Sequence, residues 1–551
     1  MTHSYKSVYD IFCKTTDRLP DGAFYCAPAM EGRDYYPDGI EFTYREILDE
    51  AETLKKSYAS AGYGHGHRVA VLLENRPELF HHFLALNALG VSMVPVNPDY
   101  LQDEMRYQFE HSDAALIVSI SHRVKDCETA AALTSANPPV IDCYDLPDQF
   151  PTAGPVPRTG PVGHDTEAAM LYTSGTTGRP KGCVLSNLYF IESGVGYTSL
   201  KGAGKFFPDT DRVLNPLPLF HMNALAVTAT GMMVIGGCLI TPDRFHPGSW
   251  WKDLRDTRAT VFHYLGVVPP MLLNAPPSES DKDHNIRFGF GAGIDPKHHA
   301  VFEERFGVPL TEGWGMTETG RIFADVIEPR QIGTRAFGKS TPEMEARVVD
   351  ENDNDVPPGT NGQMILRHTA ENPRRGFFSE YYKDEAATEE AWKGGWFHTG
   401  DTVRMDENGM LYFVDRSKNI IRRAGENIAA AEVEAVLQTH EQVAQAAVLA
   451  APDELREEEV YACIVHMPDI EANDELASAL FEWCRERLSY FKAPGYILFM
   501  DKLPTTGTQK IQKGQIFEPD TDIVSIPDVF DFRSRKKRNQ GESQLKGSAS
   551  S

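Results

Sequence analysis

Residues 171–181 carry hydroxyl, glycine and basic side chains at a density that suits the binding of a polyphosphate. The run contains the hydroxyl residues Thr173, Ser174, Thr176 and Thr177, the glycines Gly175 and Gly178, and the cations Arg179 and Lys181. An apolar stretch at 168–172 comes immediately before it, which predicts a buried strand that ends in a loop. Glycines let such a loop curl so that several N–H groups point at one anion, and the hydroxyls and cations add hydrogen bonds and charge. We therefore expect a phosphate-binding loop; a polar surface turn is the alternative interpretation.

A second polar segment has the residue types needed to hold an adenine ring and a magnesium ion. Its members are Glu312, Gly313, Trp314, Gly315, Met316, Thr317, Glu318 and Thr319. The glycines on either side of Trp314 let its ring lie flat against a purine, and Thr317 can donate a hydrogen bond to a phosphate. Glu318 can hold Mg2+, which prefers one or two carboxylates together with phosphate oxygens. The alternative is a core strand with a turn, which the polar end of the segment disfavours.

Three more segments could act on a nucleotide or an acyl group. Asp401 follows a glycine at a predicted strand end, where a carboxylate can accept hydrogen bonds from two ribose hydroxyls. Gly425 stands in a polar turn and permits close approach of the backbone to a ligand. Lys510 lies in the loop 503–513 and can neutralise the charge that develops on an acyl phosphate, with Lys513 as the competing candidate.

These segments resemble, in residue type and in order, the motifs of the adenylate-forming enzymes: acyl-CoA synthetases, peptide-synthetase adenylation domains and luciferases. The resemblance covers essentially the whole chain except its tail, with Trp314 where many members have tyrosine. It departs from the family pattern in the last loop, where Thr505 and Gln509 replace a basic residue and a glycine. Within the superfamily the chain looks most like the carnitine/crotonobetaine-CoA ligase branch.

The resemblance implies a role for each matching residue. The implied ATP and CoA contacts are Thr173, Ser174, Gly175, Thr176, Thr177, Gly178, Lys181, Gly291, Ala292, Gly293, Glu312, Gly313, Trp314, Gly315, Met316, Thr317, Asp401, Arg416, Lys418, Gly425 and Glu426. The implied magnesium ligands are Glu318 and Thr173, and the implied catalytic residues are Lys510, Glu318, Thr173 and His221. The implied acyl pocket is lined by His221, Asn223, Phe262, Tyr264, Gly293 and Thr319.

Residues 333–340 fit the Walker A pattern literally, with Lys339 as the phosphate-binding lysine. A true P-loop follows an apolar strand and opens a helix. Here a stretch broken by proline and charge precedes the segment, and residues 344–349 alternate like a strand after it. We interpret this match as chance.

Short apolar runs alternate with helical patterns in the first part of the chain. Strands are expected near 69–73, 91–96 and 114–119, and helices near 77–89 and 100–112. This spacing is typical of a parallel, doubly wound sheet, whereas residues 345–413 favour short strands with Gly and Asn turns.

The sequence therefore predicts an α/β protein with a large N-terminal domain of doubly wound sheets plus a β-rich subdomain. A small α+β C-terminal domain follows, which the resemblance implies to be mobile. We expect an ATP- and acyl-binding domain at residues 1–416, the mobile domain at 417–530 and a disordered tail at 531–551.

Charge and cysteine content exclude several classes of protein. A net charge of −25 disfavours binding to nucleic acid or anionic membranes, so a nucleotide must be bound by local positive charge. The eight cysteines lack metal-ligand or redox spacing, which favours free thiols in a reducing compartment. No signal-peptide core or membrane-length apolar run occurs, so we expect a cytoplasmic protein without membrane insertion. The composition leaves the oligomeric state open.

The resemblance implies a ligase with two half-reactions. A carboxylate attacks the α-phosphate of ATP to give acyl-AMP and pyrophosphate, with Glu318 holding Mg2+ and Lys510 stabilising the transition state. The small domain then rotates about Lys418, and the thiol of CoA attacks the acyl-adenylate. Asn223 and the aromatic residues near Phe262 suggest a compact, partly polar pocket that could hold a quaternary ammonium group by cation–π contact. We expect a small to medium polar acid, such as a carnitine- or betaine-type acid.

Several alternatives stay open at this point. The substrate could be a medium-chain or aryl acid, and the acceptor could be a separate carrier protein. From other classes come a P-loop kinase or ATPase that uses Lys339 and a nucleotide-binding regulator without activity. The presence of Glu318, Asp401, Arg416 and Lys510 together argues against the regulator.

Overall fold

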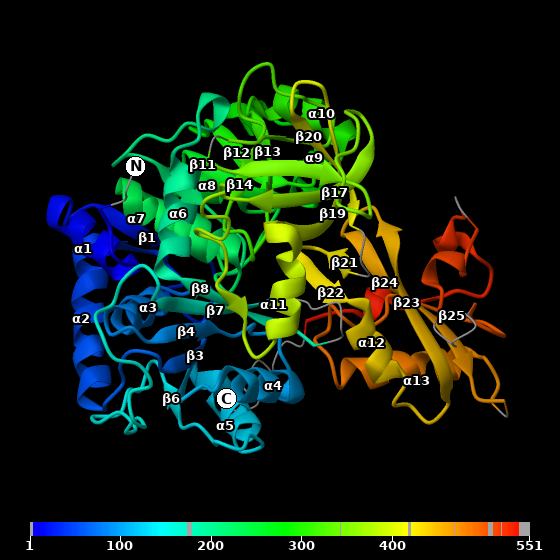
Figure 1. The fold of residues 1–551 in the computed structure, drawn as a ribbon, viewed down its shortest axis with the longest axis horizontal. Coiled ribbons are helices and arrows are strands. Elements are labelled where there is room, and N and C mark those ends of the chain that lie inside the picture. The colour runs from blue at the N-terminus through cyan, green and yellow to red at the C-terminus, as the bar shows by residue number, and fades with distance from the viewer. Residues whose placement is uncertain are drawn as a thin grey trace, which may run out of the picture. The chain divides into compact units, whose positions relative to one another are not determined.

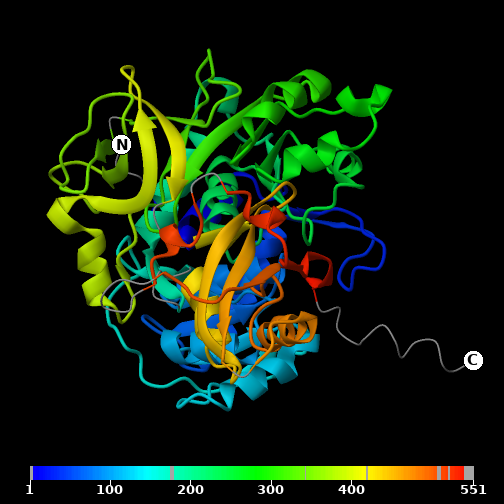
Figure 2. The same cartoon turned by 90° about the vertical axis from the view of Figure 1, so that its right-hand side faces the viewer.

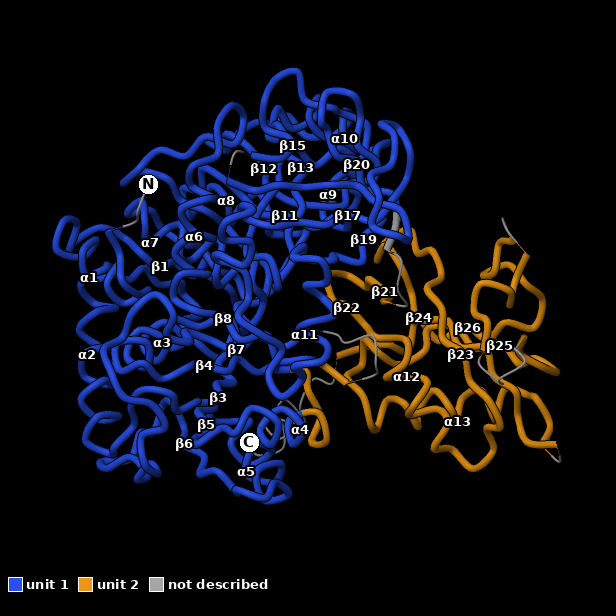
Figure 3. Tube along the Cα trace, viewed as in Figure 1, with its two compact units in different colours: residues 1–98, 105–173, 181–417 blue, residues 99–104, 174–180, 418–551 orange. Residues whose placement is uncertain are grey.

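The computed structural model describes most of the chain and divides it into two compact units. The described residues are 4–173, 179–341, 343–416, 420–468, 470–504, 511–518 and 521–538, without the side chains of Asp415 and Arg416. The large unit covers most of the chain to residue 417, and the small unit covers most of the chain beyond it (Figure 3).

One sheet of the large unit is built mainly from parallel strands. In spatial order it runs β18 (Glu380–Tyr381), β8 (Lys181–Ser186), β7 (Glu167–Thr173), β4 (Ser92–Pro95), β3 (Arg68–Leu72), β5 (Leu116–Ser119) and β6 (Val140–Asp142). The pairs from β7 to β6 are parallel, and β8 and β18 add an antiparallel edge. Every residue of β3, β4 and β5 is buried, as expected for parallel strands covered by helices on both faces.

A second sheet of the large unit has the same character. In spatial order it runs β14 (Ile322–Ala324), β13 (Leu310–Gly315), β12 (Phe288–Ala292), β11 (Val261–Leu265), β9 (Arg212–Leu214), β10 (Cys238–Ile240), β1 (Ala23–Ala27) and β2 (Ile40–Thr43). The strands from β13 to β1 are parallel, and β14 and β2 are antiparallel edges. Because parallel strands end at one edge of a sheet, residues that follow β11, β12 and β13 gather there.

The third sheet of the large unit is antiparallel throughout. It runs β15 (Ala336–Lys339), β20 (Met410–Arg416), β19 (Phe397–Met405), β17 (Asn361–Arg367) and β16 (Glu345–Val349). This is the β-rich subdomain predicted from residues 345–413. The Walker-like Lys339 ends strand β15 and is exposed, so the segment has none of the strand–loop–helix context of a P-loop.

Helices cover the sheets of the large unit (Figure 1). They are α1 (Val8–Arg18), α2 (Tyr44–Ser60), α3 (Glu78–Ala88), α4 (Gln102–Ser112), α5 (Val124–Ala131), α6 (Asn187–Thr198), α7 (Thr230–Ile235), α8 (Trp250–Asp256), α9 (Val268–Leu273), α10 (Pro296–Phe306) and α11 (Glu385–Ala391). A π-helical segment, η3 (Asn223–Ala229), leads directly into α7. Helix α2 begins with a capping box, in which Thr43 accepts a hydrogen bond from the backbone of Glu46 and the Glu46 side chain accepts one in return.

The small unit has an α+β fold, in which one sheet carries helices on one face (Figure 2). Its strands run β22 (Glu426–Ala429), β21 (Ile420–Arg423), β24 (Glu457–His466), β25 (Tyr496–Phe499) and β26 (Phe530–Asp531), and β23 (Val443–Asp453) pairs with β24. Helices α12 (Ala430–Leu437) and α13 (Asp474–Arg485) bury apolar side chains such as Val433 and Leu480 against one face. Residues around Leu503 and Ile516 cover the other face.

The predicted disordered tail requires a correction at its start. The structure places Phe530–Asp531 in strand β26, paired with β25, and describes the chain to Arg538. The basic run orders because its side chains have acidic partners: Arg533 pairs with Asp453, and the fully buried Lys536 pairs with Glu459. Residues 539–551 lie outside the described part of the chain.

Two further observations bear on the expectations from composition. All eight cysteines are free thiols, and seven of them are buried. Within the described residues, no helix combines the length and the apolar character needed to cross a membrane. The observed fold confirms the predicted class: a mixed α/β chain with a large N-terminal part and a smaller C-terminal part.

Candidate functional site

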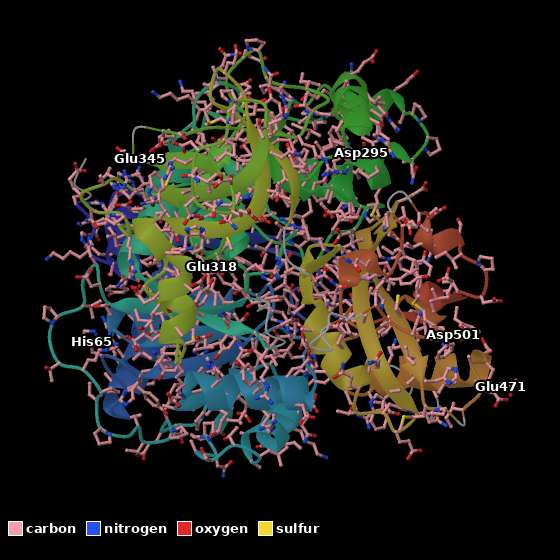
Figure 4. All side chains as sticks on the ribbon, turned by 45° about the vertical axis from the view of Figure 1, so that its right-hand side comes forward. His65, Asp295, Glu318, Glu345, Glu471 and Asp501 are labelled. Carbon is pink, nitrogen blue, oxygen red and sulfur yellow. The ribbon has the colours of Figure 1, made fainter. Side chains whose placement is uncertain are left out.

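Glu318, the predicted magnesium ligand, lies in the large unit (Figure 4). Two hydroxyl groups lie against its carboxylate. It is 4% exposed and follows β13, where its backbone carbonyl accepts a hydrogen bond from Phe378 N at 2.8 Å. Its Oε1 accepts from the Tyr381 hydroxyl at 2.9 Å and lies 3.5 Å from Thr173 Oγ1. Strands β7, β13 and β18 therefore bring together residues that are far apart in sequence.

The chemistry of this cluster fits a magnesium ion bound together with a nucleotide. A carboxylate and a threonine hydroxyl are the hard oxygen donors that Mg2+ prefers. Among the described residues, no group of three or more His, Cys, Asp or Glu side chains could form a metal cage. A cation at Glu318 would therefore need oxygens from its own substrate, as Mg2+ bound to phosphates does.

Lys181 connects the same cluster to the edge of the first sheet. This residue begins β8, and its ammonium lies 4.7 Å from the centre of the Tyr381 ring and 3.6 Å from Asp384. The predicted phosphate-loop cation thus stands on the strand beside Thr173, which ends β7 and pairs with it. Tyr381 carried no recognisable signal in the sequence, since an aromatic residue in an edge strand is ordinarily a packing residue.

The second predicted pair, Trp314 and Asp401, is joined by a hydrogen bond. The Trp314 indole nitrogen donates to Asp401 Oδ2 at 2.8 Å, and the two residues are only 6% and 1% exposed. The indole ring packs at 5.8 Å from the ring of Phe323 and 6.2 Å from that of Phe337. Asp401 lies in β19, with Arg416 opposite it on β20. A tyrosine or phenylalanine at 314 would lack an indole N–H, so this contact depends on the tryptophan.

Glu312 acts on the backbone, which the motif alone did not predict. Its carboxylate accepts hydrogen bonds from Gly293 N at 2.9 Å, from Ile294 N at 3.3 Å and from the Tyr264 hydroxyl at 2.5 Å. Burial raises its pKa to about 7, and these three donors pull in the opposite direction. The side chain therefore fixes the turn after β12, in which Gly293 has a φ of +82° that favours glycine.

Close packing also explains the glycine at 291. A Cβ there would lie 2.3 Å from the carbonyl oxygen of Tyr264 on the neighbouring strand β11. Gly291 and Ala292 end β12 and lead into Gly293, so the predicted adenine-edge loop occupies the edge at which β11, β12 and β13 finish.

The residues predicted for the acyl pocket separate onto two sides of β11. Phe262 and Tyr264 face a hydrophobic cluster with α8 and α10, where the ring of Phe262 lies 5.5 Å from that of Trp250. His263 points to the opposite side, toward η3, because successive side chains alternate across a strand. Its Nδ1 lies 2.9 Å from Asn223 Oδ1, and both groups are tied to α6 through Tyr197.

The aromatic cage expected for a quaternary ammonium therefore loses two of its members. Phe262 and Tyr264 are 0% and 1% exposed, and the Tyr264 hydroxyl is engaged with Glu312. Thr319 is also fully buried and donates to the carbonyl of Met316 at 3.0 Å, which closes a local turn. His221 and Asn223 are partly exposed.

The remaining predicted residues are distributed as follows. Gly313, Gly315, Met316 and Thr317 lie in or just after β13, while Gly425 turns β21 into β22 with a φ of +92° and Glu426 begins β22. Ser174, Gly175, Thr176, Thr177, Gly178, Lys418 and Lys510, with the side chain of Arg416, lie outside the described residues. The competing lysine, Lys513, is paired with Glu434 at 2.6 Å inside the small unit.

Family models match both units. The model of the AMP-binding enzyme family matches residues 23–382, and that of the AMP-binding enzyme C-terminal domain matches residues 432–510. The sulfoacetate–CoA ligase of Cupriavidus necator is 31% identical over 487 residues, which cover 87% of this chain and 92% of that protein. The crotonobetaine/carnitine–CoA ligase of Proteus mirabilis is 28% identical over 493 residues, covering 86% and 92%.

Solved structures share the fold at lower identity. The o-succinylbenzoate CoA synthetase of Bacillus subtilis, bound with its product analogue, superposes with a TM-score of 0.77 at 23% identity over 92% of this chain and 98% of its own. The amide bond synthetase of Marinactinospora thermotolerans gives a TM-score of 0.76 at 23% identity with the same coverage. The chain therefore belongs to the AMP-binding enzyme family and is an AMP-forming acyl-CoA ligase, which joins a carboxylic acid to CoA with the use of ATP and Mg2+.

Proposed function

We propose that this ligase acts on a small to medium polar carboxylic acid, and that the residues singled out above form its active site. The observation that carries the assignment of the site is the buried contact of Glu318 with Thr173 and Tyr381. A buried carboxylate held by two hydroxyl groups at the end of a strand has no evident packing role, whereas it suits a divalent cation.

In this proposal residues of the large unit, together with the loop 173–178, bind and orient ATP. Glu318 and Thr173 would hold Mg2+, which would supply positive charge to the phosphates that leave as pyrophosphate. The loop 173–178 and Lys181 bind the β- and γ-phosphates through hydroxyls, N–H groups and charge. Asp401 accepts hydrogen bonds from the ribose hydroxyls and is oriented by Trp314. Arg416 is a second ribose contact.

The small unit supplies the groups that change between the two half-reactions. We propose residues 417–530 as the mobile domain and Lys418 as its hinge. Lys510 neutralises the charge that develops on the acyl phosphate during adenylation. Gly425 and Glu426, at the β21–β22 turn, approach CoA in the thiol transfer, since a glycine at positive φ lets the backbone come close to a ligand.

Two relatives support a polar acid. By their names, one acts on sulfoacetate and the other on crotonobetaine or carnitine. All three are short acids with a polar group at the far end from the reacting carboxylate. We therefore propose a carnitine- or betaine-type acid or a sulfonated acid, with a medium-chain or aryl acid as the alternative.

A panel of acids tests this proposal. The full chain is incubated with MgATP, CoA and each acid, and AMP, pyrophosphate, ADP and acyl-CoA are measured. We expect AMP and pyrophosphate in equal amounts, with acyl-CoA formed from the polar short acids. Release of ADP, or acyl transfer to a carrier protein but not to CoA, would contradict the proposal.

Two lysine variants make the test specific to the site. Lys510→Ala should abolish acid-dependent pyrophosphate exchange. Lys339→Ala, at the Walker-like segment, should leave exchange unchanged because Lys339 is the exposed last residue of β15. The reverse pattern would show that the residues have been assigned wrongly.

A further inference from the structure

A buried hydrogen-bond network lies behind Asn223, at the start of η3, and its donors can be assigned from one fixed point. The backbone N–H of Leu217 donates to Asn215 Oδ1 at 2.9 Å, and a backbone N–H can only donate. The Asn215 amide is thereby oriented, and its NH2 group donates to Thr228 Oγ1 at 2.8 Å and to Asn223 Oδ1 at 3.0 Å. Asn223 Oδ1 is therefore an acceptor.

The next link fixes the tautomer of a histidine. His263 Nδ1 lies 2.9 Å from Asn223 Oδ1, and two acceptors cannot share a hydrogen bond, so Nδ1 must carry the proton. Burial lowers the pKa of His263 to about 3, so the ring is neutral and its Nε2 accepts. The Tyr197 hydroxyl, 2.5 Å away, donates to this Nε2. The Thr228 hydroxyl is used elsewhere, since it donates to the carbonyl of Asn223 at 2.9 Å.

The network leaves the Asn223 amide in a single orientation. Its oxygen accepts two hydrogen bonds from Asn215 and His263, both of which are fully buried. Asn223 itself is partly exposed, as are residues 220–222 before it, whereas η3 is buried from Ala224 onward. No described residue accepts a hydrogen bond from Asn223 Nδ2. The amide nitrogen is therefore a donor presented on the accessible side of a rigid, buried support.

The surrounding helix is consistent with a functional role for this position. Segment η3 is π-helical, and single π-turns within helices occur frequently at functional sites because they re-aim side chains at an energetic cost. The aromatic rings of Tyr197 and Phe290 pack on His263 at 5.4 and 5.2 Å, which holds the imidazole in place.

We propose that the Asn223 Nδ2 donor selects a carboxylic acid that carries a second oxyanion, such as a sulfonate or carboxylate, at the far end from its reacting group. This inference rests on the proposed function, since it assigns Asn223 to the acyl side of the site. An oxyanion accepts a charge-assisted hydrogen bond from the amide. A trimethylammonium group has no lone pair to accept one, and the rings of Phe262 and Tyr264, which could have caged it, are packed on the other side of β11.

The first test compares matched acids with the wild-type chain. The panel contains sulfoacetate, succinate, butyrate and 4-(trimethylammonio)butyrate, and kcat/KM for AMP formation is measured for each. We expect the two oxyanion acids to exceed butyrate and the ammonium acid by about 10- to 100-fold, the usual value of a hydrogen bond to a charged group in discrimination. A preference for the ammonium acid or for butyrate overturns the inference. Absence of AMP and pyrophosphate with every acid overturns the proposed function as well, which distinguishes the two failures.

Substitutions at the donor and behind it then test the mechanism. Asn223→Asp replaces the donor with an acceptor and should cut the preference for oxyanion acids at least 10-fold, with a gain for the ammonium acid. Tyr197→Phe removes the donor to His263 Nε2, so the ring can exchange tautomers and withdraw one of the two hydrogen bonds that hold Asn223 Oδ1, while the bond from Asn215 remains. This variant should lose part of its discrimination between acids while KM for ATP stays unchanged.

A control on the same helix separates orientation from packing. Tyr189 is also fully buried on α6, but its hydroxyl has no hydrogen-bond partner among the described residues, so Tyr189→Phe removes the same atom without touching the network. It should keep the wild-type preference among acids. Equal loss of discrimination in Tyr189→Phe and Tyr197→Phe, or none in Tyr197→Phe and Asn223→Asp, overturns the inference.

Discussion

Trp314→Phe is the substitution that tests the nucleotide site most sharply. It keeps an aromatic ring at the end of β13 but removes the indole N–H, which lies 2.8 Å from Asp401 Oδ2. Asp401 is 1% exposed, so bulk water cannot readily replace the lost donor. A hydrogen bond to a buried charged group contributes about 1.5–3 kcal/mol, and each 1.4 kcal/mol corresponds to about tenfold in an equilibrium or rate constant. We therefore expect kcat/KM for ATP to fall by about 10- to 100-fold.

The specificity of the effect follows from the proposed role of Asp401. If this carboxylate binds the ribose hydroxyls and Trp314 orients it, the variant should lose the ability to detect the 2′-hydroxyl. Acid-dependent pyrophosphate exchange is measured with ATP and with 2′-deoxy-ATP. We expect the wild type to prefer ATP and the variant to show a much smaller ratio, because the deoxy substrate never used the missing contact.

Trp392→Phe is the matched control. Trp392 is 3% exposed and packs against Phe377 and Phe397, but within the described part of the chain its indole nitrogen has no hydrogen-bond partner. Both substitutions remove the same ring atoms and create a similar cavity. An equal loss of activity with the two nucleotides in Trp314→Phe, or an equally large change of their ratio in Trp392→Phe, would contradict the proposed role of Trp314.

Three more predictions concern contacts elsewhere in the chain. Tyr381→Phe removes a donor to Glu318, so the Mg2+ concentration that half-saturates AMP formation should rise about tenfold, measured by metal titration at saturating ATP. Burial raises the pKa of Glu312 from its ordinary 4.5 to about 7, so its contribution to stability is complete below 4.5 and is lost as pH rises through 7. The Tm advantage of the wild type over Glu312→Gln should accordingly shrink between pH 5 and 8; a constant advantage would contradict the shifted pKa. Glu459→Gln leaves both Arg423 and Lys536 buried without their shared countercharge and should destabilise the small unit by about 3–5 kcal/mol in denaturant unfolding, whereas an unchanged midpoint would show that the cluster contributes nothing.

The secondary structure could be predicted well where hydrophobic runs are long and buried. Strand β3 (Arg68–Leu72) and helix α3 (Glu78–Ala88) lie within one residue of the ends expected from their apolar patterns, because parallel strands and their covering helices repeat a simple period. The C-terminal basic run was harder to predict. Its order depends on Glu459 and Asp453, whose pairing with it is a tertiary contact that local composition does not encode.

The candidate site shows the same division between residue type and residue contact. Motifs pointed to Glu318, Trp314 and Asp401, yet the bond between the last two follows from how β13 and β19 approach each other. Tyr381 escaped prediction because nothing local distinguishes a tyrosine that meets a carboxylate from one that packs in a core. Side-chain alternation along β11 predicts that His263 points to the opposite face from Phe262 and Tyr264. The alternation does not predict which face of the strand meets η3.

In the role proposed for Asn223, the preference among acids is set by residues that lie behind the side chain that meets the substrate. An isolated asparagine could present either end of its amide to a substrate. Its carbonyl oxygen would attract an ammonium group and its NH2 group would donate to an oxyanion, with little preference between them. The Leu217 N–H group fixes the orientation of the Asn215 amide, and the Asn215 amide in turn fixes that of Asn223. The second donor to Asn223 is a histidine that burial keeps neutral. A relative with the same asparagine but without this support would have no reason to share the preference, so comparison of pocket-facing residues alone cannot identify the acid.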